Sequence, residues 1–201
     1  MTRPKIETHV RQRQIVQAAL DIVAGSGPRV LSMANVAGRL GLVPSAIYRH
    51  FGSKEAMLLA AIDLVKDKLL ENVTLACRAS TDPMEQLHEL MVRHVRMLRE
   101  NLAIPRVVFS DEVHGGLPKL RMKARGVFRG YLARVGGIVR RGQETGQVRP
   151  DVDLRAAAML FMGMIQPAAI LWHLSGGRFE VLGQVERSWE LYRTALTGGG
   201  K

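Results

Sequence analysis

Apolar positions along the chain recur every three or four residues, which is the period of an α-helix with one buried face. Caps and helix breakers divide this pattern into segments, and we find no convincing strand pattern or internal repeat in the sequence. The pattern predicts helices over residues 10–24, 32–40, 44–51, 53–79, 82–101, 118–138, 153–174 and 181–196, with a short segment at 105–113. The sequence therefore predicts an all-α fold.

Residues 154–174 are nearly all apolar, whereas the last predicted helix places its apolar residues on one stripe. A helix that is apolar all round has to be buried on every side. In a chain of 201 residues this favours a partner subunit over one face. We therefore expect a homodimer in which the helices at 153–174 and 181–196 form a four-helix interface with their symmetry mates. Pro167 is expected to kink the first of these helices.

Other signals define where helices start and how closely they pack. Asp82, Pro83 and Glu85 have the spacing of a capping box with proline at the first helical position. Asp151 or Asp153 is placed to cap the helix that follows. The helix after Pro118 carries several glycines, each of which weakens a helix by up to about 1 kcal/mol relative to alanine. Either neighbouring segments pack very closely against these glycines or the helix bends; they are Gly126, Gly130, Gly136, Gly137 and Gly142.

The stretch from Ser32 to Lys54 predicts two short helices joined by a tight turn. Ser32 is suited to cap the first helix, and Gly41 is suited to a left-handed residue at its end. Pro44 is suited to the first position of the second helix. Ile47 and Phe51, four residues apart, are expected to face the core. The residues expected to face outward are Ser45, Ala46, Tyr48, Arg49 and His50. This pattern is typical of a helix-turn-helix.

The segment SMANVAGRLGLVPSAIYRHFGSKEAML, with RQIVQAALDIVAGSG before it, resembles the DNA-binding signature of the TetR family of transcriptional regulators. The resemblance covers about residues 11–60, and its strength lies in the ordered set of positions with their spacing. The matching positions are Ala19, Gly27, Ser32, Val36, Ala37, Gly41, Tyr48, Phe51, Lys54 and Leu58. It implies a three-helix DNA-binding domain at 1–53 and a larger helical domain for ligand binding and dimerisation at 54–201.

The resemblance also implies roles for individual residues. Tyr48, His50 and Lys54 would bind phosphates with help from Ser32, and contacts of this kind fix the register on DNA. Ser45, Ala46 and Arg49 would face base edges, and an arginine is able to grip guanine through two hydrogen bonds. Pro44 and Ala46 are small enough for close approach, but the family often carries polar residues there. Ala34 and Asn35 complete the predicted set of DNA-binding residues.

Charge agrees with a polyanionic partner, since the formal net charge is +11. Residues 1–54 contain eight basic and two acidic residues, which is a net charge of +6. About a quarter of the chain therefore carries more than half of the net positive charge. The expected partners are double-stranded operator DNA with a roughly palindromic sequence and a small-molecule effector. Repressor and activator would use the same residues, although a repressor is favoured.

The effector pocket implied for the second domain would draw on Met and aromatic residues, because thioether side chains adapt to irregular ligands. The same residue types at helical spacing also form ordinary cores. The candidates are Met91, His94, Met97, Phe109, Phe128, Tyr131, Met162, Gln166, Trp172 and His173.

The remaining features narrow the class of protein. One cysteine, Cys77, excludes an internal disulfide and favours a reducing compartment. No signal peptide is evident and no uninterrupted apolar run approaches the length of a membrane span, so we expect a cytoplasmic protein without a membrane partner. The histidines lack metal-ligand spacing, and no cofactor fingerprint or nucleophile motif is present. We therefore expect no metal, no cofactor and no catalytic residue. The alternative is a helical small-molecule-binding protein or enzyme that does not bind DNA.

Overall fold

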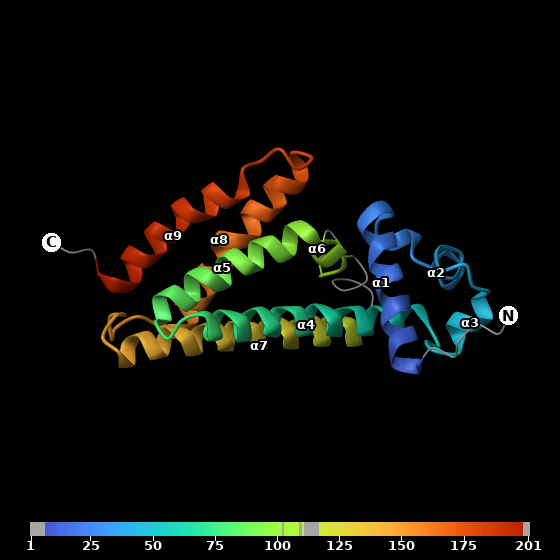
Figure 1. Cartoon of the computed structure of the whole chain (residues 1–201), viewed down its shortest axis with the longest axis horizontal. Coiled ribbons are helices and arrows are strands. Elements are labelled where there is room, and N and C mark those ends of the chain that lie inside the picture. Colours follow the sequence, from blue (N-terminus) through green and yellow to red (C-terminus); the bar gives the residue numbers. More distant parts are fainter. Residues whose placement is uncertain (1–6, 102, 109, 111–116, 199–201) are drawn as a thin grey trace. The chain divides into compact units, whose positions relative to one another are not determined.

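The computed structural model describes residues 7–101, 103–108, 110 and 117–198, and within these ranges all regular structure is helical (Figure 1). This confirms the all-α prediction. The elements are α1 (Thr8–Ser26), the 3₁₀ turn η1 (Pro28–Val30), α2 (Met33–Arg39), α3 (Pro44–Tyr48), α4 (Lys54–Ala79), α5 (Pro83–Glu100), α6 (Ala103–Val108), α7 (Pro118–Glu144), α8 (Leu154–Leu174) and α9 (Val181–Thr197).

The chain divides into two compact units, each made of two segments. Unit 1 is Met1–Lys66 with Asn101–Val127, and unit 2 is Asp67–Glu100 with Phe128–Lys201. Unit 1 therefore includes α6 and the start of α7, beyond the predicted boundary between residues 53 and 54. The reason is that Ala103, Val107 and Leu120 belong to the same apolar core as the first helices. The functional boundary at 53 and 54 remains a prediction.

The core of unit 1 is built from buried residues of α1, α2, α3 and α4, together with residues of α6 and α7. Ile15 of α1, Val36 of α2, Ile47 of α3 and Met57 of α4 are all fully buried there. The helix predicted at 10–24 begins slightly earlier, at Thr8, and continues to Ser26. These contacts hold α2 and α3 against the apolar core of unit 1.

In unit 2, α8 and α9 pack side by side, and α5 packs on both (Figure 1). The predicted stripe on α9 is confirmed, because its four members are all buried: Val185, Trp189, Tyr192 and Leu196. The Tyr192 hydroxyl donates a hydrogen bond of 3.1 Å to the carbonyl of Ala157 on α8. Burial raises the pKa of this hydroxyl above its ordinary value.

Helix α8 has one buried face and one exposed apolar face within the chain. Phe161 and Ile165 are fully buried, whereas Leu160 is 60% exposed and Leu171 is 46% exposed. Pro167 lies inside the helix and does not end it. The chain itself therefore leaves one apolar face of this helix uncovered, and the partner subunit expected over it stays a prediction.

The expectation that no uninterrupted apolar run approaches the length of a membrane span concerns the same helix, whose apolar residues are interrupted by Arg155 and Gln166. Judged by length and composition alone, Leu154–Leu174 is the one helix in the described ranges that could span a membrane. Its inner residues, however, pack on α5 and α9 within unit 2. A core helix passes the same test, so its length and composition assign no membrane role.

The helix caps largely follow the sequence. Asp82 accepts hydrogen bonds from the backbone N–H groups of Met84 and Glu85, at 2.7 and 3.1 Å, and Asp153 accepts one from Ala156 at 2.6 Å. In a capping box the Asp82 N–H would donate to the Glu85 side chain. Here the Ser80 hydroxyl lies between these two groups and bonds to both. The Ser80 hydroxyl donates to Glu85 at 2.5 Å and accepts from the Asp82 N–H at 3.0 Å.

The glycines of α7 fall into two classes. A Cβ atom on Gly142 would lie 2.6 Å from a methyl carbon of Val148, and one on Gly136 would lie 3.4 Å from the carbonyl oxygen of Leu154. Close packing therefore explains Gly142, whereas the contact at Gly136 is an ordinary van der Waals distance. At the other three glycines nothing lies within 4 Å of such an atom: Gly126, Gly130 and Gly137.

Candidate nucleic-acid interface

Helix α2 starts as the sequence predicts. Ser32 is extended, with φ −143° and ψ 159°, and its hydroxyl oxygen accepts a hydrogen bond of 3.1 Å from the backbone N–H of Asn35. This satisfies one of the N–H groups that a helix start leaves without an internal partner. The cap sets where α2 begins relative to the turn before it.

The turn between α2 and α3 depends on one glycine. Gly41 has φ +63°, in the left-handed region where glycine has no steric penalty. The N–H of Leu42 donates to the carbonyl of Ala37 at 2.8 Å, and the N–H of Gly41 donates to that of Gly38 at 3.1 Å. This pair of bonds is a Schellman motif. It joins the two helices at a fixed angle, as the helix-turn-helix interpretation requires.

Helix α3 begins at Pro44, as predicted, and directs most of the expected side chains outward. Ile47 and Phe51 are buried, whereas Ser45 and Arg49 are exposed and Tyr48 is 56% exposed. The exposed groups on this short helix and on its C-cap residue, Arg49, are a hydroxyl, a phenol and a guanidinium. All three are able to donate hydrogen bonds to phosphate oxygens or base edges.

Ala46 corrects the sequence-based assignment. It was expected to face base edges, but its side chain is 8% exposed and lies on the buried side of α3 next to Ile47. The helix is only five residues long, so its inner face takes in two adjacent positions. Of the residues predicted to face base edges, only Ser45 and Arg49 are therefore exposed, with the exposed ring of Pro44 beside them.

The other predicted DNA ligands take part in contacts within unit 1. The Lys54 amine is half-buried and donates to the carbonyl of Pro28 at 3.1 Å, while the exposed Asn35 side chain donates to that of Val30 at 2.7 Å. His50 is half-buried, and its buried Nδ1 atom has no hydrogen-bond partner among the described residues. A phosphate would have to approach its other ring nitrogen. Ala34 is exposed on α2.

Among the predicted effector residues, five are buried in unit 2. The Nδ1 atom of His94 and the hydroxyl of Tyr131 lie 2.8 Å apart, and their rings meet edge to face with centroids 5.2 Å apart. Burial lowers the pKa of His94 to about 4, so its imidazole is neutral at physiological pH. The same cause raises the pKa of Tyr131. The other three buried members are Met91, Met97 and Met162.

The remaining candidates that the structure describes are half-buried or exposed rather than buried. Trp172 and His173 are half-buried and contact one another with ring centroids 5.2 Å apart, and Gln166 is also half-buried. Phe128 is 39% exposed on α7. Phe109 lies outside the described residues.

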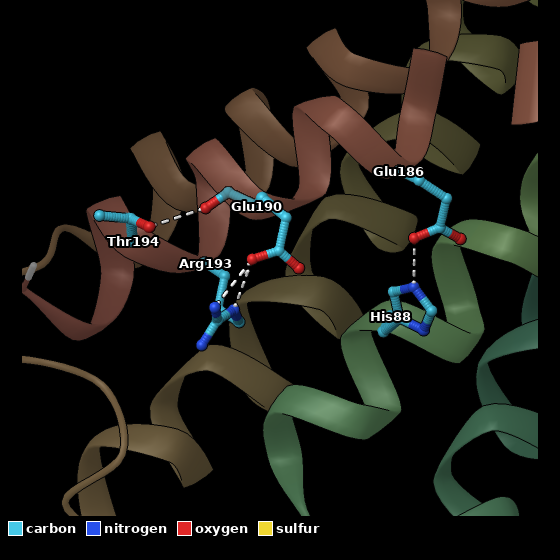
Figure 2. A network of polar contacts seen from close by, with 5 residues as sticks. All are labelled: His88, Glu186, Glu190, Arg193 and Thr194. Carbon is cyan, nitrogen blue, oxygen red and sulfur yellow. Dashed lines mark hydrogen bonds and ion pairs between the residues drawn. The ribbon is translucent and has the colours of Figure 1, made fainter. Parts of the chain in front are cut away.

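Nothing in the sequence pattern indicated the open groove of about 490 Å³ on unit 2. Figure 2 shows His88 of α5 pointing toward Glu186 of α9, and their side chains are 2.8 Å apart. Arg193 pairs with Glu190 at 2.8 Å. None of the predicted effector residues lines the groove, whose walls are Ala79, Ser80, Met84, Glu85, His88, Glu89, Trp189, Glu190 and Arg193. Within the described ranges no group of three or more His, Cys, Asp or Glu is arranged to hold a metal ion.

Comparison with known proteins covers both parts of the chain. Residues 15–61 match the family described as bacterial regulatory proteins of the tetR family. Residues 65–195 match the YsiA-like protein C-terminal region.

Individual relatives agree with this assignment. A fatty acid metabolism regulator protein of Bacillus subtilis is 24% identical over 171 residues, which is 84% of this chain and 87% of that protein. The solved structure of the regulator FadR from Bacillus subtilis in complex with stearoyl-CoA superposes with a TM-score of 0.80. It is 21% identical, covering 92% of this chain and 98% of that one. PfmR, a TetR family transcriptional regulator from Thermus thermophilus, has a TM-score of 0.71 and 26% identity, covering 95% and 97%.

These relatives are regulators rather than enzymes, and the helix-turn-helix on α2 and α3 is the part of the fold that reads DNA. The alternative of an enzyme or of a binding protein without a DNA-binding domain is therefore excluded. The chain belongs to the TetR family and is a ligand-responsive, DNA-binding transcriptional regulator.

Proposed function

We propose that the protein is a cytoplasmic, homodimeric repressor that leaves a roughly palindromic operator when a long-chain acyl-CoA binds to its second domain. The observation that carries the DNA-binding part is the exposed donor set of α3 and its C-cap, namely Ser45, Tyr48 and Arg49, on a helix pair joined by a capped turn. Arg49 reads a base edge, and Tyr48 with Ser32 holds phosphates. His50, which follows α3, and Lys54, at the start of α4, add further phosphate contacts.

The exposed face of α8 supports the homodimer. Leu160, Pro167, Leu171 and Leu174 follow one another at intervals of seven, four and three residues, and all are exposed in the isolated chain. A contiguous apolar face of this kind marks a protein interface. Two copies related by a two-fold axis would cover it with α8 and α9 of each chain. The two α3 helices would then meet half-sites about one helical turn or a little more apart.

The relatives and the chemistry of unit 2 support this effector class. A related regulator was solved with stearoyl-CoA, and a second relative is a regulator of fatty acid metabolism. Three methionines, Met91, Met97 and Met162, are buried in unit 2, as is the polar pair of His94 with Tyr131. Flexible thioether side chains suit a long acyl chain, and the polar pair suits a thioester carbonyl. Such a ligand shifts the protein away from DNA only if it binds the released arrangement more tightly.

A mobility shift with genomic fragments tests DNA binding, and a salt series tests whether that binding depends on contacts to phosphates. We expect the protein to retard a specific fragment, with log K falling against log salt by about 0.9 for each phosphate neutralised. A response that is flat with salt contradicts the proposal.

Adding stearoyl-CoA, free stearate or CoA alone to the protein–operator complex tests the effector class. Release by stearoyl-CoA only supports an acyl thioester. Equal release by stearate assigns a fatty acid instead, and the absence of release in all three arms removes this effector class.

A further inference from the structure

One side chain of α6 ties that helix to the end of α1. The guanidinium Nη1 of Arg106 donates hydrogen bonds to two main-chain carbonyls in the last turn of α1, those of Val23, at 3.3 Å, and Ala24. The last carbonyls of a helix have no partner within the helix, and a cation at this end also interacts favourably with the helix dipole. Helix α1 has no basic residue of its own in that turn. The N–H of Gly27 also donates to the Val23 carbonyl, at 3.0 Å, so Arg106 adds a side-chain donor from a distant part of the sequence to a helix end that the backbone caps only in part.

The connection that follows is held in the same way by two further side chains. Lys54, at the first position of α4, donates to the carbonyl of Pro28, and Asn35 of α2 donates to that of Val30. Three helices other than α1 thus contribute a donor to carbonyls between residues 23 and 30, all within unit 1. The apolar side of α6 is fixed too, because Ala103 and Val107 are buried in the core of this unit.

This connection decides where the reading helices start. It ends at Leu31, and the next residue is the Ser32 cap of α2. Because the Schellman motif at Gly41 couples α2 to α3, a displacement of the connection moves both helices together. Specific contacts to bases require the side chains to be held within roughly 0.5 Å of their productive geometry.

We infer that Arg106 is a positioning residue for operator recognition: by capping α1 it holds the α1–α2 connection in place and so aims α3, without contacting DNA itself. This inference rests on the proposed operator binding. The role of Arg106 differs from the phosphate-binding roles proposed for Tyr48 and Lys54, because Arg106 acts through the backbone of α1. Loss of its hydrogen bonds should weaken specific recognition and leave the number of neutralised phosphates unchanged.

The test measures affinity for operator and for non-specific duplex DNA over a salt series, using the full chain with Arg106→Gln and Arg106→Lys. Arg121→Gln, an exposed cation on α7 in the same unit, is the matched charge control. We expect Arg106→Gln to weaken operator binding about tenfold, as the loss of charge-assisted hydrogen bonds implies. Its salt slope and non-specific affinity should equal those of the control. Arg106→Lys, which retains a cation at the helix end, should recover part of the loss.

Two results would overturn the inference. A salt slope that becomes about 0.9 less steep in Arg106→Gln, but not in the control, would make Arg106 a phosphate ligand. Unchanged operator affinity in Arg106→Gln would show that the cap does not aim α3. If Arg106→Gln does not fold, Arg106→Met decides: it keeps the apolar stem but cannot donate, so full wild-type affinity would show that the two carbonyl bonds are not needed. Failure of the wild-type chain to bind any operator would instead refute the proposed function.

Discussion

Tyr48 is the side chain of α3 whose role is easiest to isolate. It is 56% exposed and contributes little to the core, so its removal should not disturb folding. We predict that Tyr48→Ala abolishes operator binding in a mobility shift while the oligomeric state by size-exclusion chromatography stays unchanged. Tyr48→Phe separates the hydroxyl from the ring. Full binding by Tyr48→Phe would exclude a hydrogen bond from the phenol to phosphate.

His94 links the stability of the protein to pH. Burial lowers its pKa from 6.5 to about 4, so between these values an unfolded chain binds a proton that the folded chain does not. The free energy of unfolding should therefore be fully retained above pH 6.5 and fall by about 3 kcal/mol as pH drops to 4. Urea unfolding at pH 7.5 and pH 4.5 measures this loss. Because the glutamine of His94→Gln cannot titrate, this variant should lose less free energy of unfolding between the two pH values than the wild-type protein. An equal loss in the variant and the wild-type protein would show that other groups cause the loss.

Two glycines of α7 give a matched pair that separates packing from helix propensity. An alanine at 142 would place its Cβ atom 2.6 Å from a methyl carbon of Val148, whose β-branched side chain has little freedom to turn. An alanine at 126 would meet nothing within 4 Å. We predict that Gly142→Ala destabilises by about 1–3 kcal/mol, whereas Gly126→Ala stabilises by up to about 1 kcal/mol. Urea unfolding would contradict this if both variants shifted stability in the same direction.

Helix starts and the α2–α3 turn could be predicted because their signals are local. Ser32, Asp82 and Pro44 act through backbone groups within a few residues, and Gly41 is set by its own φ angle. The side chain of Ala46 could not be placed in this way. Its burial depends on how a five-residue helix lies on the core, which helical spacing alone does not determine.

Contacts between distant segments were the part that periodicity did not reveal. The bonds from Arg106 to the end of α1 join residues more than 80 positions apart, and nothing in either segment marks the partner. The partner of Glu85 was also missed, because the Ser80 hydroxyl occupies the position that the capping box reserves for the Asp82 backbone. The DNA-reading helices could therefore be located from local signals, whereas the contacts that hold them in place could not.

The assembly as a whole depends on the exposed face of α8, since a regulator that reads two half-sites needs both copies. Leu160 is 60% exposed and lies on that face, so an aspartate there would be solvated in a monomer but would lose its water in a dimer. We predict that Leu160→Asp yields monomers at micromolar concentration, measured by sedimentation, and that these monomers lose operator affinity. Met122→Asp, on α7 and 67% exposed, is the control and should remain dimeric. An unchanged dimer for Leu160→Asp would place the subunit contact elsewhere, because a charge cannot be buried without a partner at so little cost.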